Sequence, residues 1–314
     1  MTLPKSSPRL FAGARRSWQV FCCSLGGANR TRNLAIHYLS EQRRIVMPSP
    51  HRPYPQTWDA QKISATWIGQ SSVLINFFGL TILTDPAFSA RIGLRTPFGT
   101  IGPKRLIAPA LPLQDLPSID LLLISHAHFD HLDLPSLRFF PRSTPVVTAR
   151  HTSDVIRRAR LEKITELSWG QKTVVNTAAG PIAIEAIEVK HWGARWRKDV
   201  HRGYNGYVLS RGGQRVLFGG DTAYLDSFRH LRSQGPLSLA VMPIGAYEPW
   251  LGSHCNPEQA VQMTNDAGAD FLLPVHHQTF VLSREPLAEP MERLLNSIDP
   301  ARVAWREIGE TFTN

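Results

Sequence analysis

One short stretch of the sequence carries four side chains that can bind a metal ion. The apolar run Leu121–Ile124 has the length and composition of a buried strand, and polar residues follow it directly. Within six positions stand His126, His128, Asp130 and His131. Imidazole and carboxylate groups together are ligands for zinc and the neighbouring first-row metals. The stretch therefore predicts a metal centre with room for a second ion, and not a histidine-rich surface loop.

Three more apolar runs end in a residue of the same chemical kind. They are the runs that precede His191, Asp221 and His276. Strand ends gather at one edge of a sheet, which is where α/β proteins place their chemistry. We therefore expect these side chains to join residues 126–131 in one site.

Short strands dominate the rest of the pattern, and helices stand between them late in each half of the chain. This arrangement predicts two sheets with helices on their outer faces. The runs Ser72–Phe78 and Leu80–Thr84 predict a hairpin around Gly79. Residues 88–109 predict a long loop that mixes apolar and basic side chains. Val303–Ile308 predicts the last strand.

The six-residue signature His-x-His-x-Asp-His at 126–131 resembles that of the metallo-β-lactamase superfamily. The later ligands of that superfamily match His191, Asp221 and His276 in order, and the resemblance covers roughly residues 63–312. It implies an α/β (α+β) fold, namely a four-layer αββα sandwich, and a metal-dependent hydrolase.

Within the superfamily, the chain is most similar to the N-acylphosphatidylethanolamine phospholipase D group. The matching stretches are Leu83–Pro86, Gly102–Arg105, Ile124–Asp133, His191-Trp192, Gly220–Thr222 and Pro243–Pro249. The last stretch is the most specific, and it argues against the bacterial ascorbate-phosphate lactonases, which share the core ligands. One position departs from the pattern. Phe129 stands where the lipid enzymes carry Tyr, so a phenolic hydroxyl near the phosphate is missing.

The resemblance implies two Zn²⁺ ions per chain, with other first-row divalent metals as alternatives. His126, His128 and His191 would hold one ion, Asp130, His131 and His276 would hold the other, and Asp221 would bridge both. Two ions about 3.5–4 Å apart share a water and lower its pKa, so that a bridging hydroxide is the nucleophile. Asp221 is therefore a catalytic residue as well as a ligand. His277 competes with His276 for the last position, but Thr279-Phe280 matches the family spacing for His276.

Three further residues receive roles from the same resemblance. Asp85 would support the ligand histidines by hydrogen bonding, and its alternative role is to cap a turn. His254 would be a catalytic residue that faces the substrate, where it binds phosphate or protonates the leaving alkoxide. Its alternative is an ordinary loop histidine. Phe129 would also contact the substrate. Trp192 and Trp196 would extend the apolar surface that binds the substrate, and their alternative is to belong to the core.

The net charge of +10 is concentrated near the N-terminus. Residues 1–50 hold eight basic residues and one acidic residue, which gives +7, so the remaining residues are only mildly basic. Nucleic acid is therefore not expected as a partner, because a long polyanion needs many Lys and Arg contacts. No apolar run approaches the roughly 20 residues of a transmembrane helix. The cysteines Cys22, Cys23 and Cys255 give neither a disulfide framework nor a thiolate zinc site.

Two regions are expected. Residues 51–314 form the hydrolase domain, and residues 1–50 form a basic extension that is disordered or a targeting segment. Met47, which precedes a proline-rich stretch, is an alternative start, and residues 1–46 are expected to be dispensable for chemistry. The expected localisation is cytoplasmic or membrane-associated, with N-terminal targeting as the alternative.

The leading functional prediction is a dinuclear zinc phosphodiesterase of the phospholipase D type, acting on a small-molecule or lipid phosphodiester. The first alternative is a zinc hydrolase of another small anionic ester or lactone, similar to the ascorbate-phosphate lactonases. The less favoured alternative is a nuclease of the ribonuclease Z type. A peripheral membrane contact and a homodimer are the further interactions expected.

Overall fold

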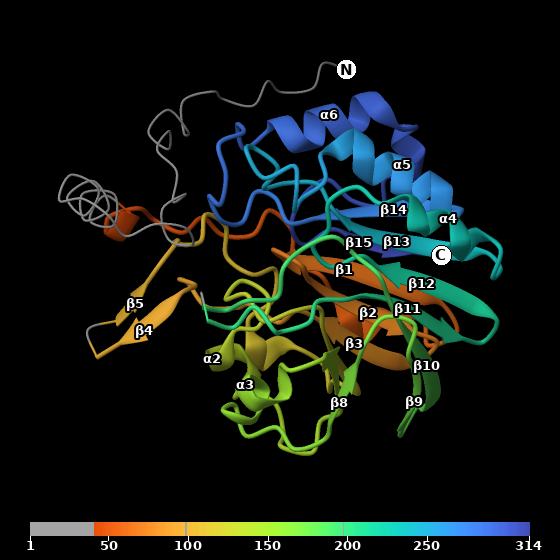
Figure 1. Cartoon of the computed structure of the whole chain (residues 1–314), viewed down its shortest axis with the longest axis horizontal. Helices are drawn as coiled ribbons and strands as arrows, with labels where there is room; N and C mark the ends of the chain where they lie inside the picture. The colour runs from red at the N-terminus through yellow and green to blue at the C-terminus, as the bar shows by residue number, and fades with distance from the viewer. Residues whose placement is uncertain (1–40, 98, 197) are drawn as a thin grey trace.

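The computed structural model describes residues 41–97, 99–196 and 198–314, and most strands of this part form two large sheets (Figure 1). The strands of the first sheet are β1 (Ile63–Gly69), β2 (Ser72–Phe77), β3 (Leu80–Thr84), β6 (Leu121–Ile124), β7 (Val146–Ala149), β8 (Ile164–Leu167) and β15 (Thr311–Thr313). Those of the second sheet are β9 (Lys172–Thr177), β10 (Gly180–Ile187), β11 (Gly206–Arg211), β12 (Gln214–Phe218), β13 (Leu237–Pro243) and β14 (Ala269–Val275). Their orders are β15-β1-β2-β3-β6-β7-β8 and β14-β13-β12-β11-β10-β9.

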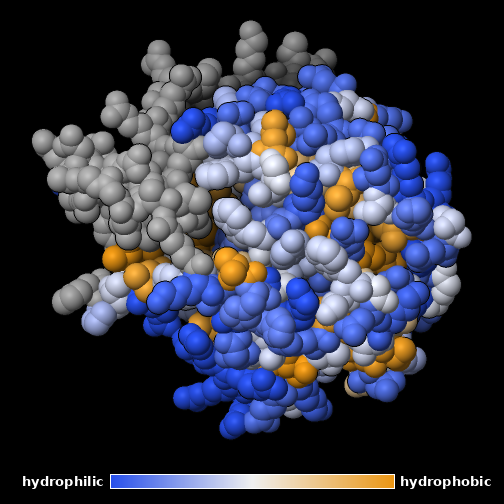
Figure 2. Space-filling model, in the orientation of Figure 1, coloured by the Kyte–Doolittle hydropathy of each residue, from blue (hydrophilic) through white to orange (hydrophobic). Residues whose placement is uncertain are grey.

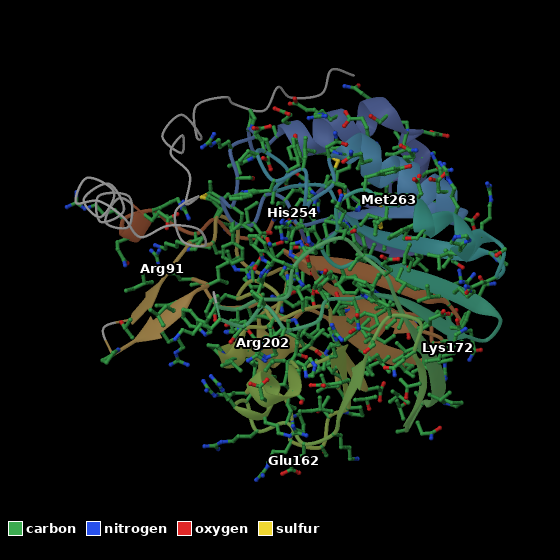
Figure 3. All side chains as sticks on the ribbon, in the orientation of Figure 1. Arg91, Glu162, Lys172, Arg202, His254 and Met263 are labelled. Carbon is green, nitrogen blue, oxygen red and sulfur yellow. The ribbon has the colours of Figure 1, made fainter. Side chains whose placement is uncertain are left out.

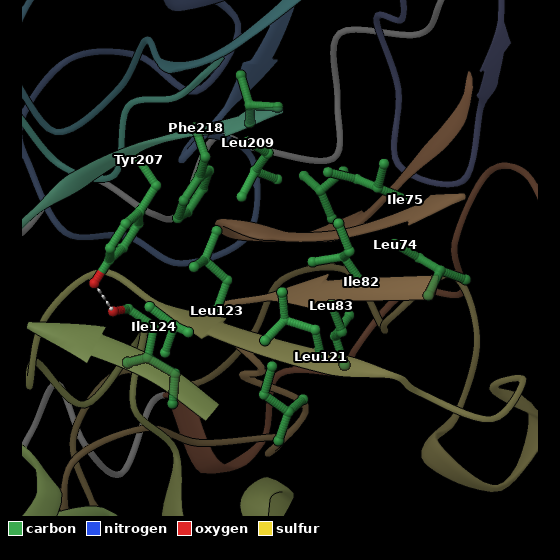
Figure 4. Packing of buried hydrophobic residues seen from close by; sticks show 14 of the residues in the cluster. Leu74, Ile75, Ile82, Leu83, Leu121, Leu123, Ile124, Tyr207, Leu209 and Phe218 are labelled. Carbon is green, nitrogen blue, oxygen red and sulfur yellow. Dashed lines mark hydrogen bonds between the residues drawn. The ribbon is translucent and has the colours of Figure 1, made fainter. Parts of the chain in front are cut away.

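The space between the two sheets is the main hydrophobic core. Tyr207, Leu209 and Phe218 of the second sheet face Leu121 and Leu123 of the first across this core (Figure 4). The Tyr207 hydroxyl satisfies its hydrogen-bonding need by donating to the carbonyl oxygen of Ile124 at 2.9 Å. Each such side chain contributes roughly 1.5–3 kcal/mol through burial, so this interface holds the strand ends of both sheets in place.

A second apolar cluster covers the outer face of the second sheet. Alternate residues of its strands point outward, among them Leu217 of β12 and Met242 of β13, and they join the buried face of the long helices. The helices of the described chain are α2 (Leu134–Leu137), α3 (Ser153–Arg157), α4 (Arg229–Arg232), α5 (Pro257–Ala267) and α6 (Glu289–Ser297). α4, α5 and α6 lie on the side of β13 and β14, and α2 and α3 lie on the side of the first sheet (Figure 1). The predicted αββα layering is therefore confirmed.

Helix α5 shows how the sequence fixes the ends of an element. The side chain of Asn256 accepts a hydrogen bond from the Gln259 amide, and the Gln259 side chain accepts one from the Asn256 amide. This capping box satisfies two amides that the first helical turn leaves free. The helix ends at Gly268, whose φ of +74° is accessible to glycine at little cost.

The parallel strands bring their carboxyl ends to one edge. β3, β6, β7 and β8 pair in parallel in the first sheet, as do β12, β13 and β14 in the second. The residues that follow β3, β6, β12 and β14 are therefore placed together. They include Asp85, His126, Asp221 and His276.

The structure differs from the sequence-based expectation in three places. The predicted last strand, Val303–Ile308, makes only a single bridge, between Val303 and Leu272, and the last strand is β15 instead. Trp305 and Ile308 are apolar because they fill the core. Strand β8 was not predicted, and the expected loop 88–109 contains a small hairpin of β4 (Leu94–Thr96) and β5 (Gly99–Ile101).

The chain just before residue 51 packs against the 91–108 segment. Met47 forms a parallel bridge with Ile107, and the buried Glu41 carboxylate accepts hydrogen bonds from Arg91 and the Lys104 amide. Arg91 stands at the base of the β4–β5 hairpin (Figure 3). Predictions about residues 1–40 lie outside the described residues. The domain boundary at residue 51 stays a prediction. Residues as early as Glu41 contact the predicted hydrolase domain.

The surface of the described residues carries both polar and hydrophobic side chains. On the face shown in Figure 2, hydrophobic side chains form separate groups among polar ones. In residues 41–97, 99–196 and 198–314, every helix is too short or too polar to span a bilayer.

Candidate metal centre

The seven predicted ligands meet where the two sheets bring their strand ends together. Two groups of residues present ligand atoms that lie within 4.8 Å of one another. The first group is His126, His128, His191 and Asp221, and the second is Asp130, His131 and His276. Local backbone geometry helps to place them. Gly220, before Asp221, has a φ of +58°, and a Cβ there would lie 2.8 Å from the Asn205 carbonyl oxygen.

The first position is formed by three ring nitrogens that face each other. Nε2 of His126 lies 2.8 Å from Nδ1 of His128, and Nε2 of His191 lies 3.3 Å from the same atom. Nitrogens that share a tetrahedral ion at about 2.0–2.1 Å are separated by similar distances. The geometry therefore suits one small cation.

The second position has a mixed donor set. Nε2 of His131 and Nε2 of His276 each lie 3.3 Å from Oδ2 of Asp130. Its two histidine rings are stacked, with centroids 5.3 Å apart. Nitrogen and carboxylate oxygen without a thiolate are ligands that zinc and its first-row neighbours accept.

Asp221 connects the two positions. Its Oδ2 lies 3.1 Å from Nε2 of His131 and 3.2 Å from Nε2 of His276. The same oxygen lies 3.7 Å from Nε2 of His191 and 4.0 Å from Nε2 of His126. Its Oδ1 is buried and has no hydrogen-bond partner within the described chain. A buried carboxylate oxygen without a partner is costly, so an added cation fits this place.

The hydrogen bonds on the far side of the rings show that cations fit here. Nδ1 of His126 donates to Ser125 Oγ at 2.9 Å, and Nδ1 of His191 donates to the Ser253 carbonyl oxygen at 2.8 Å. Nδ1 of His131 donates to Asp85 Oδ2 at 2.7 Å. In a neutral imidazole the other nitrogen then carries a lone pair and no proton. His126 and His191 each present such a lone pair to Nδ1 of His128, at 2.8 and 3.3 Å. One proton on that nitrogen can satisfy only one of the two, so a cation between the three rings fits the arrangement.

Electrostatics in the site agree with this fit. Burial lowers the pKa of His126 well below its usual value, and the neighbouring imidazoles lower it further. Burial also opposes ionisation of Asp221, but the surrounding histidines, His131 and His276 first, hold its pKa well below the usual range. Burial disfavours the charged form of His131 too, and nearby carboxylates, Asp221 foremost, nevertheless raise its pKa well above the usual value. The site thus keeps its carboxylates ionised and attracts positive charge.

Asp85 lies where a supporting carboxylate was predicted. It is fully buried beneath the metal ligands, and its Oδ2 accepts the hydrogen bond from His131. His277 is buried instead against the Trp67 ring, with ring centroids 4.5 Å apart. Within the described chain its ring nitrogens have no hydrogen-bond partner, and it belongs to neither ligand group. Of the two histidines, His276 is the one whose ring nitrogen lies beside Asp130 and Asp221, at 3.3 and 3.2 Å.

His254 lies closer to the ligands than its predicted role requires. Its Nδ1 is 3.9 Å from Oδ2 of Asp221, and its ring centroid is 4.9 Å from that of His191. It also forms a third group with Asp221 and His276 that could hold an ion. Figure 3 labels it in the interior of the view. Burial lowers the pKa of His254 to about 3, so it enters the site as a neutral ring.

Four aromatic side chains lie beside the candidate ligands, namely Phe129, Trp192, Trp196 and Trp250, and we call this group the aromatic mouth. The Phe129 ring is covered by the Arg195 guanidinium, whose central carbon lies 3.9 Å from the ring centroid, and by the edge of Trp196 at 5.3 Å. Trp192 contacts the His128 ring and lies 6.5 Å from the Trp250 ring. Burial lowers the pKa of Arg195 to about 10, so its charge is retained at neutral pH.

Sequence reasoning missed two residues that form hydrogen bonds with predicted ligands or with Asp85. Ser125 lies between Asp85 and His126, and the Gln70 side chain donates to Oδ2 of Asp130 at 2.8 Å. Both stand next to a strand in a polar stretch, where serine and glutamine also occur in ordinary turns. Gln70 has one distinguishing signal, because it follows Gly69 at a break between two strongly apolar strands.

Comparison with known proteins gives one match to a family model. The model of the beta-lactamase superfamily domain matches residues 81–277 of the chain. A metallo hydrolase of the archaeon Ignicoccus hospitalis has a similar structure, with a TM-score of 0.59 and 20% identity over 81% of this chain and 98% of that one. This likeness concerns the fold alone.

Two curated relatives are similar over most of the chain. An uncharacterised protein of Mycobacterium tuberculosis is 33% identical over 78% of this chain, and the match spans only 66% of that protein's length. The N-acyl-phosphatidylethanolamine-hydrolyzing phospholipase D 1 of Caenorhabditis elegans is 29% identical over 95% of this chain and 93% of its own.

Proposed function

The chain belongs to the beta-lactamase superfamily and is a metal-dependent hydrolase, and we propose that it is a dinuclear zinc phosphodiesterase of the N-acylphosphatidylethanolamine phospholipase D type. The observation that carries the proposal is the position of Asp221. Its Oδ2 lies within 4.0 Å of ring nitrogens from both ligand groups. A single carboxylate oxygen between two nitrogen-rich positions is what a bridged pair of ions requires.

Zinc is the ion that the donor set favours. The two positions offer imidazole nitrogens and carboxylate oxygens, and no thiolate takes part. Hard cations such as Mg²⁺ and Ca²⁺ prefer sites built from oxygen alone. Other first-row divalent metals accept the same ligands, so the metal is to be determined by measurement.

When bound, two such ions supply a hydroxide at neutral pH and neutralise charge on a phosphoryl group. The residues of the chain then divide the remaining work. Asp221 fixes the spacing of the two positions. His254 is held 3.9 Å from Asp221, where the N–H of its neutral ring can donate a hydrogen bond to a phosphoryl oxygen or to the leaving alkoxide oxygen.

The aromatic mouth supports a substrate with an apolar portion. Trp192 and Trp196 are exposed beside the ligand loops, and Phe129 lines the same opening. Arg195 adds a positive charge over Phe129, which suits an anionic phosphodiester that also carries hydrocarbon. The name of the nematode relative points to the same substrate class.

The alternative function is hydrolysis of another small anionic ester or lactone by the same metal centre. Phe129 favours this alternative, because it lacks the phenolic hydroxyl that the lipid enzymes carry at this position. The expected peripheral membrane contact, the homodimer and the absence of nucleic acid among the partners all remain predictions.

One enzyme preparation can separate these functions. Bis-p-nitrophenyl phosphate, an N-acylated phosphatidylethanolamine, a lactone and a structured RNA are assayed side by side, with and without chelator. The proposal expects chelator-sensitive cleavage of the two phosphodiesters, with the lipid as the better substrate. Hydrolysis of the lactone alone would support the alternative, and cleavage of RNA without lipid turnover would contradict both.

A further inference from the structure

We propose that Ser125 is a positioning residue that extends the hydrogen bonding of Asp85 to His126, so that one buried carboxylate holds one histidine of each metal position. The inference deepens the proposed function and rests on its two metal positions. It concerns Ser125, whose hydroxyl forms hydrogen bonds with Asp85 and His126.

The Asp85 carboxylate accepts three hydrogen bonds, and two of them lead to candidate ligand histidines. Oδ1 accepts the Ser125 amide at 2.7 Å. Oδ2 accepts the Ser125 hydroxyl at 2.6 Å and Nδ1–H of His131 at 2.7 Å. Asp85, Ser125 and His131 are each 0% exposed, so water does not compete for these bonds. Hydrogen bonds to an ionised group are shorter and stronger than neutral ones, and burial strengthens them further.

The direction of the chain of bonds follows from counting protons. An ionised carboxylate only accepts hydrogen bonds, so the single hydroxyl proton of Ser125 points to Asp85. The Ser125 oxygen is then free to accept, and Nδ1 of His126 lies 2.9 Å away as the donor. This fixes the proton of His126 on Nδ1 and leaves Nε2 unprotonated toward His128 and the first metal position.

The place of Asp85 does not depend on the Ser125 hydroxyl alone, because the Ser125 amide also donates to its carboxylate. The Asp85 amide donates to the Leu123 carbonyl oxygen at 2.9 Å, and the Asp85 carbonyl oxygen accepts the Ser72 hydroxyl at 2.6 Å. Removing the Ser125 hydroxyl therefore leaves the bond from Asp85 to His131 intact. The two histidines should respond differently to Ser125→Ala and alike to Asp85→Asn.

The chain offers a matched control in Ser136. It is as buried as Ser125, its hydroxyl donates to the Asp133 carboxylate, and it also accepts the Phe88 amide at 2.9 Å. The Ser136→Ala variant removes the same kind of hydroxyl–carboxylate bond from the neighbouring helix α2. Any general cost of losing a buried hydroxyl appears in this control as well.

The test measures zinc affinity in the purified full-length chain by isothermal titration of Zn²⁺ into metal-free protein. His276→Ala leaves the first position to be titrated alone, and His191→Ala leaves the second. In the His276→Ala background, Ser125→Ala should weaken zinc binding by about 10- to 100-fold, which is typical when a metal-bound histidine loses its supporting partner. In the His191→Ala background, Ser125→Ala should change nothing, and Asp85→Asn should weaken binding by the same factor.

Ser125→Thr keeps the hydroxyl and should restore affinity in the first background, and Ser136→Ala should behave like its parent in both. Equal effects of Ser125→Ala in the two backgrounds, or no effect in either, would overturn the inference. Failure of the proposed function has a different signature, because the unmodified chain would then bind fewer than two zinc ions.

Discussion

The side-chain amide of Gln70 donates a 2.8 Å hydrogen bond to Oδ2 of Asp130, the same oxygen that lies 3.3 Å from the ring nitrogens of His131 and His276. The Gln70 carbonyl oxygen accepts the His276 amide at 3.0 Å. Gln70 therefore holds both a ligand side chain and the backbone of another ligand, and it does so from the turn between β1 and β2. We therefore expect the second metal position to depend on a residue that stands 60 positions before Asp130 in the sequence.

Replacing Gln70 with Ala should weaken the second metal position. Alanine, like glutamine, has a Cβ, so the strain of the positive φ of 55° at this position is unchanged. The variant loses the side-chain amide that donates to Asp130. A loss of about 10-fold or more in zinc affinity for one of two sites is expected, as for other partners of metal ligands. Titration of metal-free protein with Zn²⁺ measures this. Unchanged affinity for both sites would show that Asp130 needs no such support.

The seven candidate ligands and Asp85 could be predicted from the sequence, whereas Ser125 and Gln70 could not. Four ligands stand in one signature, and the other three each end a strongly apolar run, so type and spacing identify them. Ser125 and Gln70 carry no such local pattern, and their roles arise only when separate strands meet. The prediction of a strand over Val303–Ile308 was wrong for a related reason. Its apolar residues, such as Trp305, fill the core without pairing into a sheet.

Replacing Asp221 with Ala should disrupt both metal positions at once. The variant loses the one oxygen that lies between the two ligand groups, so metal content should fall and hydrolysis should be abolished. Elemental analysis of the purified protein, together with turnover of bis-p-nitrophenyl phosphate, measures both effects. Asp226→Ala is the control, since Asp226 follows the same strand but lies on the surface near Arg229. Full metal occupancy with activity in Asp221→Ala would contradict the dinuclear site.

Replacing His254 with Ala separates a substrate role from a ligand role. If His254 acts on the substrate, the variant should keep its metal content and lose turnover by about 10²-fold, the size typical of a general acid. The alternative is that His254 itself binds a metal ion, since its Nδ1 lies only 3.9 Å from Oδ2 of Asp221. Loss of a metal ion in His254→Ala would show that this histidine is an additional ligand.

The stability of the chain should depend on Glu166 in mildly acidic solution. Its carboxylate accepts hydrogen bonds from the amides of His151, Thr152 and Ser153 at the start of α3. Burial opposes ionisation, but these bonds, from Ser153 first, lower the pKa of Glu166 below its usual value. A lowered folded-state pKa stabilises the fold above the unfolded pKa, and this stabilisation is lost as the pH falls through the folded-state value.

Between pH 6 and pH 3, the free energy of unfolding should therefore fall further for the unmodified chain than for Glu166→Gln. The difference should be about 1 kcal/mol or less, because the group is half-exposed and solvent screens it. Urea unfolding across this pH range measures the difference. Parallel pH profiles for the two proteins would show that the carboxylate contributes nothing through its charge.

Two truncations test where the folded body begins. The sequence-based expectation is that residues 1–46 are dispensable. The structure gives Glu41 a buried carboxylate that accepts hydrogen bonds from Arg91 at 3.0 Å, from Arg44 at 3.2 Å and from the Lys104 amide at 3.1 Å. Deleting residues 1–40 keeps these bonds, and deleting residues 1–46 removes Glu41 and leaves the Lys104 amide without its acceptor.

We expect the shorter deletion to leave the free energy of unfolding unchanged and the longer one to lower it by about 1–3 kcal/mol, the cost of leaving a buried polar group unsatisfied. Turnover of a soluble phosphodiester should be unchanged by either deletion, because Glu41 belongs to neither ligand group at the metal centre. Glu41→Gln in the full chain isolates the charge from the loss of the segment, and it should give part of the same destabilisation. Equal unfolding free energies for the two truncated chains would place the boundary at Met47, and loss of activity in the longer truncation would mean that the segment also supports the site.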